Sequence, residues 1–117
     1  MVIRQGEVYW VELDEPKGSE PGYRHPFVIV QNDAFNKSTI NTVVACMLTS
    51  NVKLASSPGN ILLGKGDANL PKASVVNVTQ ILTLNKSDLE QKIGQLPKEK
   101  VNQIIDGIEF LLKPRVV

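Results

Sequence analysis

The chain has 117 residues, of which 42% are hydrophobic, and it carries 13 basic and 12 acidic side chains. This length and composition predict one soluble globular domain, residues 1–117, rather than a disordered or multidomain chain. No apolar run reaches the roughly 20 residues of a membrane helix, and the N-terminus lacks a signal-peptide pattern. A single cysteine, Cys46, forms no intramolecular disulfide. We therefore expect a cytoplasmic protein without membrane contact, with Cys46 buried in the core.

Charge is distributed unevenly along the chain. Residues 1–33 carry three cations and six acids, whereas residues 34–87 carry five lysines and one acid. A basic middle on a nearly neutral protein permits a modest polyanion site. It argues against sequence-indifferent binding of duplex DNA, which requires many phosphate contacts.

Short apolar runs bounded by turn residues predict at least five strands. Residues 14–25, rich in glycine and proline, are predicted as a loop, so that Pro26 opens the second strand, where a strand tolerates proline. Residues 32–41 are polar and leave room for a helical turn. The last strand either ends at residue 79 or continues to residue 84. The predicted strands are residues 6–13, 26–31, 42–48, 61–63 and 73–79.

Two helices are predicted near the C-terminus. Ser87 and Glu90 form a capping box and Gly94 is a stop signal, which predicts a short helix over residues 87–93. A second helix begins near Pro97, a residue favoured in a first turn. Its apolar stripe predicts a face packed against the sheet, a second subunit or both. The stripe comprises Val101, Ile104, Ile105, Ile108, Leu111 and Leu112. The elements together predict a mainly β, α+β fold: a small, SH3-like, partly open barrel with a C-terminal helix.

Several kinds of chemistry are disfavoured by the residue types. Metal catalysis needs clustered His, Cys, Asp or Glu, but the chain has one His and one Cys. It contains no Walker loop, no GxSxG elbow and no GxGxxG motif. We therefore expect neither a metal site nor a cofactor.

The stretch KGSEPGYRHP, residues 17–26, places the only histidine beside an arginine. RNA supplies its own nucleophile, the 2′-OH, so its cleavage needs only a base, an acid and a cation for the charge on phosphate. A histidine, an arginine, a glutamate and a threonine provide these groups. Histidine suits proton transfer because imidazole ordinarily titrates near neutral pH.

The order of several motifs resembles the MazF/PemK family of toxin endoribonucleases. These motifs are GEVYWVEL, KGSE, HPFVIVQND, VVACMLTSN, LPKASVVNVTQILTLNK and IGQL, and the resemblance extends from residue 6 to about residue 112. The resemblance implies a CcdB/MazF-type barrel that forms a homodimer and cuts single-stranded mRNA without a metal. The products are a 2′,3′-cyclic phosphate and a 5′-OH, and cleavage inhibits translation and growth. A cognate antitoxin is expected to block the dimer groove.

The resemblance also implies site residues. It places the catalytic threonine at Thr49 and the catalytic glutamate of the loop at Glu20, with Ser19 and Ser50 beside them as RNA contacts. Lys53 and Lys65 are further candidates for an RNA path, against the alternative that they are ordinary surface lysines.

One departure from the family concerns its key arginine, which usually stands directly before the strand-opening proline. Here His25 occupies that place and Arg24 comes one residue earlier. Adjacent residues in extended chain point to opposite sides, so a strict alignment directs the imidazole into the site. Three interpretations stay open: Arg24 still reaches the phosphate, His25 acts as acid or base with Arg24 or Lys53 as the cation, or the site is impaired.

Two other functions compete with the ribonuclease. The CcdB branch of the same fold binds DNA gyrase through C-terminal apolar and aromatic residues, but this chain ends FLLKPRVV, without a terminal aromatic residue. A non-catalytic SH3-like interaction module is the third interpretation. A ribonuclease site requires Arg24 or His25, Thr49 and Glu20 to meet at a concave face.

Overall fold

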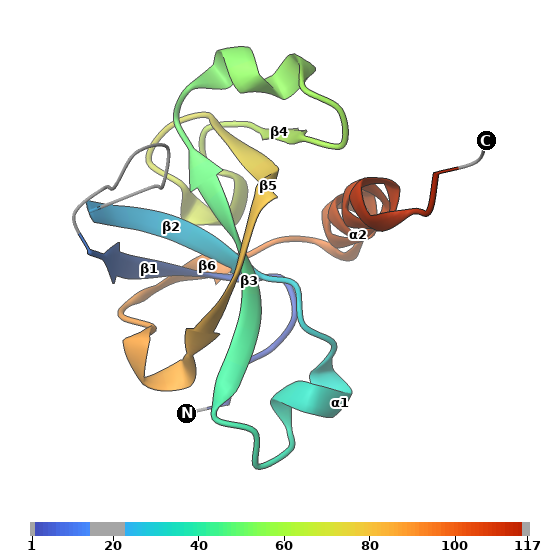
Figure 1. The fold of residues 1–117 in the computed structure, drawn as a ribbon. Helices are drawn as coiled ribbons and strands as arrows, with labels where there is room; N and C mark the ends of the chain where they lie inside the picture. Colours follow the sequence, from blue (N-terminus) through green and yellow to red (C-terminus); the bar gives the residue numbers. More distant parts are fainter. Residues whose placement is uncertain (1, 15–22, 116–117) are drawn as a thin grey trace.

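The computed structural model describes residues 2–14 and 23–115. Within these residues, six strands form one antiparallel sheet in the order β4-β5-β3-β2-β1-β6. The sheet curls strongly, and the C-terminal helix α2 lies against one side of it (Figure 1). The strands are β1 (Glu7–Leu13), β2 (Tyr23–Ile29), β3 (Thr42–Thr49), β4 (Ile61–Leu63), β5 (Ser74–Asn85) and β6 (Lys92–Gln95). The predicted α+β class is confirmed, and β5 takes the longer of its two predicted extents.

Helical elements connect and flank the strands. The helices are α1 (Asp33–Asn36) and α2 (Lys98–Leu112), and the 3₁₀ turns are η1 (Val52–Ser56), η2 (Asp67–Asn69) and η3 (Lys86–Asp88). The α1 turn falls in the polar segment predicted to hold it, and the Asn32 side chain caps it by accepting from the Ala34 amide at 2.8 Å. No helix among the described residues is long and apolar enough to cross a membrane.

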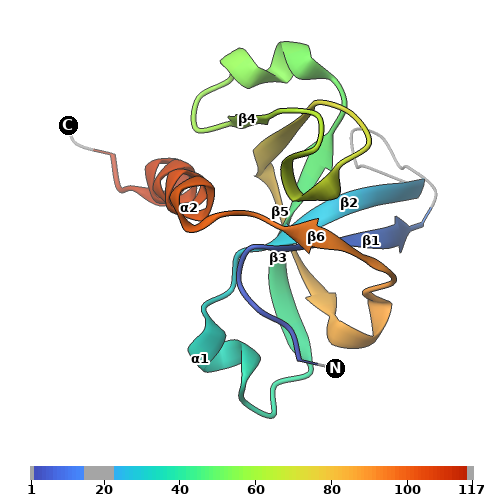
Figure 2. The same ribbon diagram turned by 180° about the vertical axis from the view of Figure 1, so that it is seen from behind.

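Turn η2 lies against strand β6 and brings the two ends of the sheet toward each other (Figure 2). The Asn69 side chain donates to the Ile93 carbonyl at 3.2 Å. A Cβ atom at Gly94 would collide with the backbone of Ala68, so only glycine fits this approach. These contacts nearly close the sheet and give the partly open barrel that the strand pattern predicts.

Two apolar clusters lie on opposite faces of the sheet, as alternation along β3 demonstrates. Cys46 and Leu48 belong to the first cluster, which also contains Ile104 and Ile108 of α2. Their neighbours Ala45 and Met47 belong to the second. Because successive strand residues point to opposite sides, β3 is buried from both faces. This explains why its sequence is continuously apolar rather than alternating.

Cys46 is fully buried, as predicted, and its thiol donates toward the Asn77 carbonyl at 3.1 Å. Burial raises the pKa of the thiol to about 12. The thiolate form that reacts with electrophiles is therefore scarce at neutral pH.

Strand β2 begins at Tyr23, so the prediction that Pro26 opens this strand is wrong. Residues 23–28 pair with β1, whereas only residues 27–29 pair with β3. The first half of β2 is thus hydrogen-bonded on one side only. Pro26, which lacks an N–H group, is tolerated there because the other side needs no donor.

The predicted helix over residues 87–93 is also wrong. Only the single turn η3 forms, and Gly94 lies inside strand β6 instead of ending a helix. The Glu90 amide donates to the Trp10 carbonyl at 2.9 Å, and the Trp10 amide donates to the Gln91 carbonyl at 3.0 Å. Pairing with β1 therefore competes successfully with a helix too short to be stable alone.

The predicted packing face of α2 is confirmed as far as Ile108, but the last turn of the helix is exposed. Ile104 and Ile108 are buried against the first cluster. At the end of the helix, by contrast, Phe110 and Leu112 are 64% and 69% exposed. Pro97 is the N-cap rather than a first-turn residue, and Pro114 follows the helix end. The sheet accordingly covers only part of the apolar stripe.

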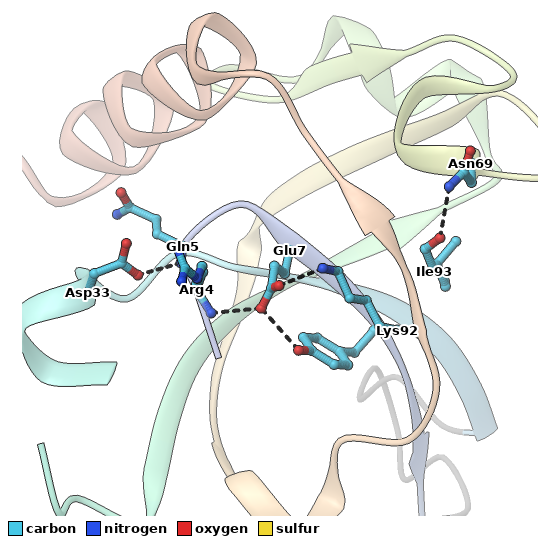
Figure 3. Close-up of polar contacts among 8 residues, drawn as sticks. Arg4, Gln5, Glu7, Asp33, Asn69, Lys92 and Ile93 are labelled. Atoms are coloured by element: carbon cyan, nitrogen blue, oxygen red, sulfur yellow. Dashed lines mark hydrogen bonds and ion pairs between the residues drawn. The ribbon is translucent and has the colours of Figure 1, made fainter. Parts of the chain in front are cut away.

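A buried carboxylate, Glu7, ties β1 to β6 (Figure 3). It accepts hydrogen bonds from the Arg4 amide at 2.7 Å and the Tyr9 hydroxyl at 3.0 Å, and it pairs with Lys92 at 2.7 Å. Burial alone would raise the pKa of Glu7, but hydrogen bonds from Lys92, Arg4 and Tyr9 outweigh it and hold the pKa below its ordinary value. The same burial and the Glu7 charge raise the pKa of Tyr9 to about 12.

We expect Glu7→Gln to lower the free energy of unfolding by about 2 kcal/mol at pH 7. Since the pKa of Glu7 is lower in the folded than in the unfolded state, its contribution is present above the unfolded value of about 4.3 and is lost as pH falls below it. Urea unfolding from pH 7 to pH 3 should therefore show a weaker acid dependence in the variant. The exposed Glu109→Gln is the control, and an acid dependence unchanged by Glu7→Gln would contradict the assignment.

Candidate active site

A cavity of about 230 Å³ opens where β2 and β3 separate. It forms there because β3 pairs with β2 only from Phe27 onward, so the start of β2 and the end of β3 diverge. The loop before β5 forms the remaining wall. The lining residues are Trp10, Arg24, His25, Pro26, Leu48, Thr49, Ser50, Leu70, Pro71, Lys72 and Ser74.

Arg24 is held over the indole of Trp10. The strand register pairs Arg24 with Glu12 and Pro26 with Trp10, so Arg24 and Trp10 project from the same face of the sheet. The guanidinium carbon lies 4.4 Å from the centroid of the indole ring, a cation–π contact. Arg24 Nε also donates to Glu90 Oε1 at 3.1 Å. The guanidinium is therefore placed at the cavity wall by contacts on two sides.

His25 is half-buried and lines the same cavity as Arg24. Strand alternation points the Arg24 and His25 side chains to opposite sides of β2. Both nevertheless line the cavity, which lies beside the part of β2 that does not pair with β3. The structure thus brings the cation and the imidazole together, rather than exchanging one for the other.

Thr49 and Ser50 enter the cavity from the end of β3. Thr49 Oγ1 accepts a hydrogen bond from the Asn51 amide at 3.2 Å, a local turn contact that fixes the side chain. Its hydroxyl hydrogen is not used by that bond and can be donated to a ligand. Ser50 is exposed beside it.

Lys72 and Ser74 also line the cavity, and sequence reasoning did not single them out. Ser74 is buried, and its hydroxyl donates to the Lys72 carbonyl at 3.1 Å. The signal available in the sequence was a lysine directly after Leu70-Pro71 and just before a buried strand. Such a lysine stands at a loop–strand junction, where binding residues concentrate.

The other predicted site residues are not brought together with these. Lys53 on η1 and Lys65 before η2 are exposed, and neither lines the cavity. Ser19 and Glu20 lie outside the described residues.

The lining chemistry suits an anion. Arg24 and Lys72 supply positive charge, Thr49 and Ser50 supply hydroxyl donors, and the described lining residues include no carboxylate. Oxygen-rich acidic sets hold hard metal ions, whereas cations with hydroxyl donors bind phosphate. Trp10 also lines the cavity, with the Arg24 guanidinium over its ring, 4.4 Å from the centroid.

Known proteins similar to this chain were found by sequence and by structure. Endoribonuclease MazF6 of Mycobacterium tuberculosis strain ATCC 25618 / H37Rv is 43% identical over 112 residues, 96% of this chain and 98% of the relative. Endoribonuclease MazF of Staphylococcus saprophyticus is 34% identical over 95% of this chain and 92% of its own length. A solved mycobacterial endoribonuclease in complex with its cognate antitoxin has a TM-score of 0.77 and 27% identity, covering 97% of this chain and 99% of that one.

The model of one protein family spans most of the chain. It describes the PemK-like, MazF-like toxins of type II toxin–antitoxin systems and matches residues 4–112. The match includes every strand and α2, together with the cavity between β2 and β3. With the curated relatives and the shared fold, it establishes that this chain belongs to the PemK/MazF family of toxins.

Proposed function

We propose that this chain is a toxin endoribonuclease that cuts single-stranded RNA without a metal ion, leaving a 2′,3′-cyclic phosphate and a 5′-OH. The observation that carries the proposal is the meeting of Arg24, His25 and Thr49 at one cationic cavity. The endoribonuclease names of the curated relatives support it. The RNA substrate is mRNA in the cytoplasm, and its cleavage stops translation and growth.

The reaction needs one bond to form and one to break. The 2′-oxygen attacks phosphorus, its proton passes to a base, and the bond from phosphorus to the 5′-oxygen breaks as that oxygen receives a proton. Arg24 stabilises the negative charge on the non-bridging oxygens. His25 transfers one proton, and Thr49 donates a hydrogen bond to the phosphate.

The loop residues complete the machinery. Glu20 is the second proton-transfer group, and Ser19 and Ser50 contact the RNA backbone. Lys72 adds a phosphate contact inside the cavity, while Lys53 and Lys65 extend the RNA path along the surface.

The end of α2 carries an exposed apolar surface that we assign to protein partners. Phe110 and Leu112 are exposed, and apolar hollows of about 540 and 460 Å³ lie beside the last turns of the helix. Exposed apolar surface of this kind marks a protein interface. We assign it to a homodimer, and the structure of a relative with its cognate antitoxin supports an antitoxin as the second partner.

The test is cleavage of a long single-stranded RNA in EDTA, with a matched oligonucleotide that carries 2′-deoxyribose at the cut position. We expect the RNA to be cut with a cyclic-phosphate end and the 2′-deoxy substrate to survive, because it lacks the nucleophile. Cleavage of the 2′-deoxy substrate, or loss of all cleavage in EDTA that Mg²⁺ restores, would refute the proposed mechanism.

A further inference from the structure

We propose that Glu90 is a positioning residue, which orients the guanidinium of Arg24 toward the RNA phosphate. The inference rests on the proposed ribonuclease function. Sequence reasoning places Glu90 in a helical capping box, but the structure assigns it a place beside the site.

Glu90 Oε1 accepts from Arg24 Nε at 3.1 Å, across 66 positions of sequence. The two side chains are 38% and 48% exposed. An ion pair this exposed contributes little to the free energy of folding. We therefore assign it the role of holding the Arg24 guanidinium in place.

Backbone hydrogen bonds hold Glu90 beside the strand that carries Trp10. Glu90 is tied to Trp10 by backbone pairing: its amide donates to the Trp10 carbonyl at 2.9 Å, and the Trp10 amide donates to the Gln91 carbonyl at 3.0 Å. Trp10 in turn carries the ring against which Arg24 lies, 4.4 Å from the guanidinium carbon to the ring centroid. The carboxylate and the indole therefore stand on one backbone frame and hold the guanidinium between them.

The contact with Glu90 leaves the two Nη groups of Arg24 available for a phosphate. Glu90 takes the Nε–H with one oxygen, and among the described residues no other side chain forms a hydrogen bond with the Arg24 guanidinium. The two Nη groups form the fork that matches two phosphate oxygens. A long arginine side chain that is already ordered loses less freedom when the transition state forms. Glu90 thus contributes to kcat without touching RNA.

The chain offers a matched control. Glu12 is exposed and pairs directly with Arg24 across β1 and β2, but no bond joins the two side chains. Glu12→Ala removes the same charge at a similar place without removing the contact. Glu90→Gln removes the charge but keeps an amide oxygen that accepts from Nε, whereas Glu90→Ala removes both.

The experiment measures RNA cleavage and, separately, the emission of Trp10, the only tryptophan of the chain. We expect Glu90→Ala to lower kcat about tenfold with KM changed less than about twofold, while Glu90→Gln stays within about threefold of the parent. In the free protein, Glu90→Ala should alter Trp10 emission and Glu12→Ala should not. In an Arg24→Ala background, Glu90→Ala should have no further effect on kcat, because no guanidinium is left for the carboxylate to orient.

Two outcomes overturn the inference. A rise in kcat/KM on Glu90→Ala means that the carboxylate competes with RNA for Arg24. An unchanged kcat means that the pair is only structural. A parent protein that cuts no RNA refutes the proposed function, whereas active parent and equally active Glu90→Ala proteins refute the positioning role alone.

Discussion

Replacement of Arg24 with alanine is expected to lower kcat/KM for RNA cleavage by about 10³-fold, with little change in thermal stability. The guanidinium is the cation held at the cavity wall, by Trp10 on one side and Glu90 on the other. It is positioned to meet charge that grows on phosphate in the transition state, so its removal should reduce kcat more than it raises KM. Cleavage of a defined RNA by purified protein under single-turnover conditions measures this loss.

Two further variants distinguish the role of Arg24 from a general loss of positive charge and from the role of His25. Lys37→Ala removes an exposed cation outside the cavity lining and should leave kcat unchanged. His25→Ala should lower kcat by about 10²-fold and flatten its dependence on pH, because it removes a proton-transfer group rather than the cation. If Arg24→Ala remained active while His25→Ala lost all activity, the imidazole would carry the role assigned here to the guanidinium.

A large loss of stability is also expected from Gly107→Ala in α2. Helix propensity alone favours alanine over glycine by about 1 kcal/mol. At this position, however, a Cβ atom would collide with the carbonyl oxygen of Gly59, which lies in a turn with a φ of +79°. The colliding atom belongs to the backbone and cannot rotate away. We expect a net loss of about 2 kcal/mol and a fall in Tm of about 10 °C.

Asn102→Ala provides the matched comparison on the same helix. Asn102 is exposed, so alanine there should stabilise by about 0.5 kcal/mol through propensity alone. Alanine is thus expected to lower the free energy of unfolding at position 107 and to raise it at position 102 of the same helix. Equilibrium unfolding in urea measures both, and a Gly107→Ala protein as stable as the parent would show that α2 does not need its close approach to Gly59.

The strands were predictable from sequence because their cores are continuous runs of apolar residues. Strand β3 reads as one buried segment, and the structure buries it on both faces. The wrong predictions for Pro26 and for residues 87–93 share one cause, which is pairing with β1. That strand draws residues 23–25 into β2 and residues 92–95 into β6. Local signals such as Pro26 and the Ser87 capping box carry no information about a partner strand far away in sequence.

The site was predictable in part. Thr49 at the end of β3 and the Arg24–His25 pair do border one cavity. The places of Lys72 and Glu90 at the site could not be predicted, because they depend on segments that reach the cavity from other parts of the fold. The place of the Arg24 side chain could not be predicted from alternation alone, because it depends on the indole of Trp10, which lies on the same face and contacts the guanidinium.

The buried thiol of Cys46 has a practical consequence. It lies on the central strand with no exposed surface, and its pKa of about 12 makes it inert while the sheet is intact. An alkylating reagent can therefore reach it only when the sheet opens. Because it is the single cysteine, each modified molecule records one such opening event, and mass spectrometry can count these events over time. The alkylated fraction thus reports the rate of opening from a residue that the chain already contains.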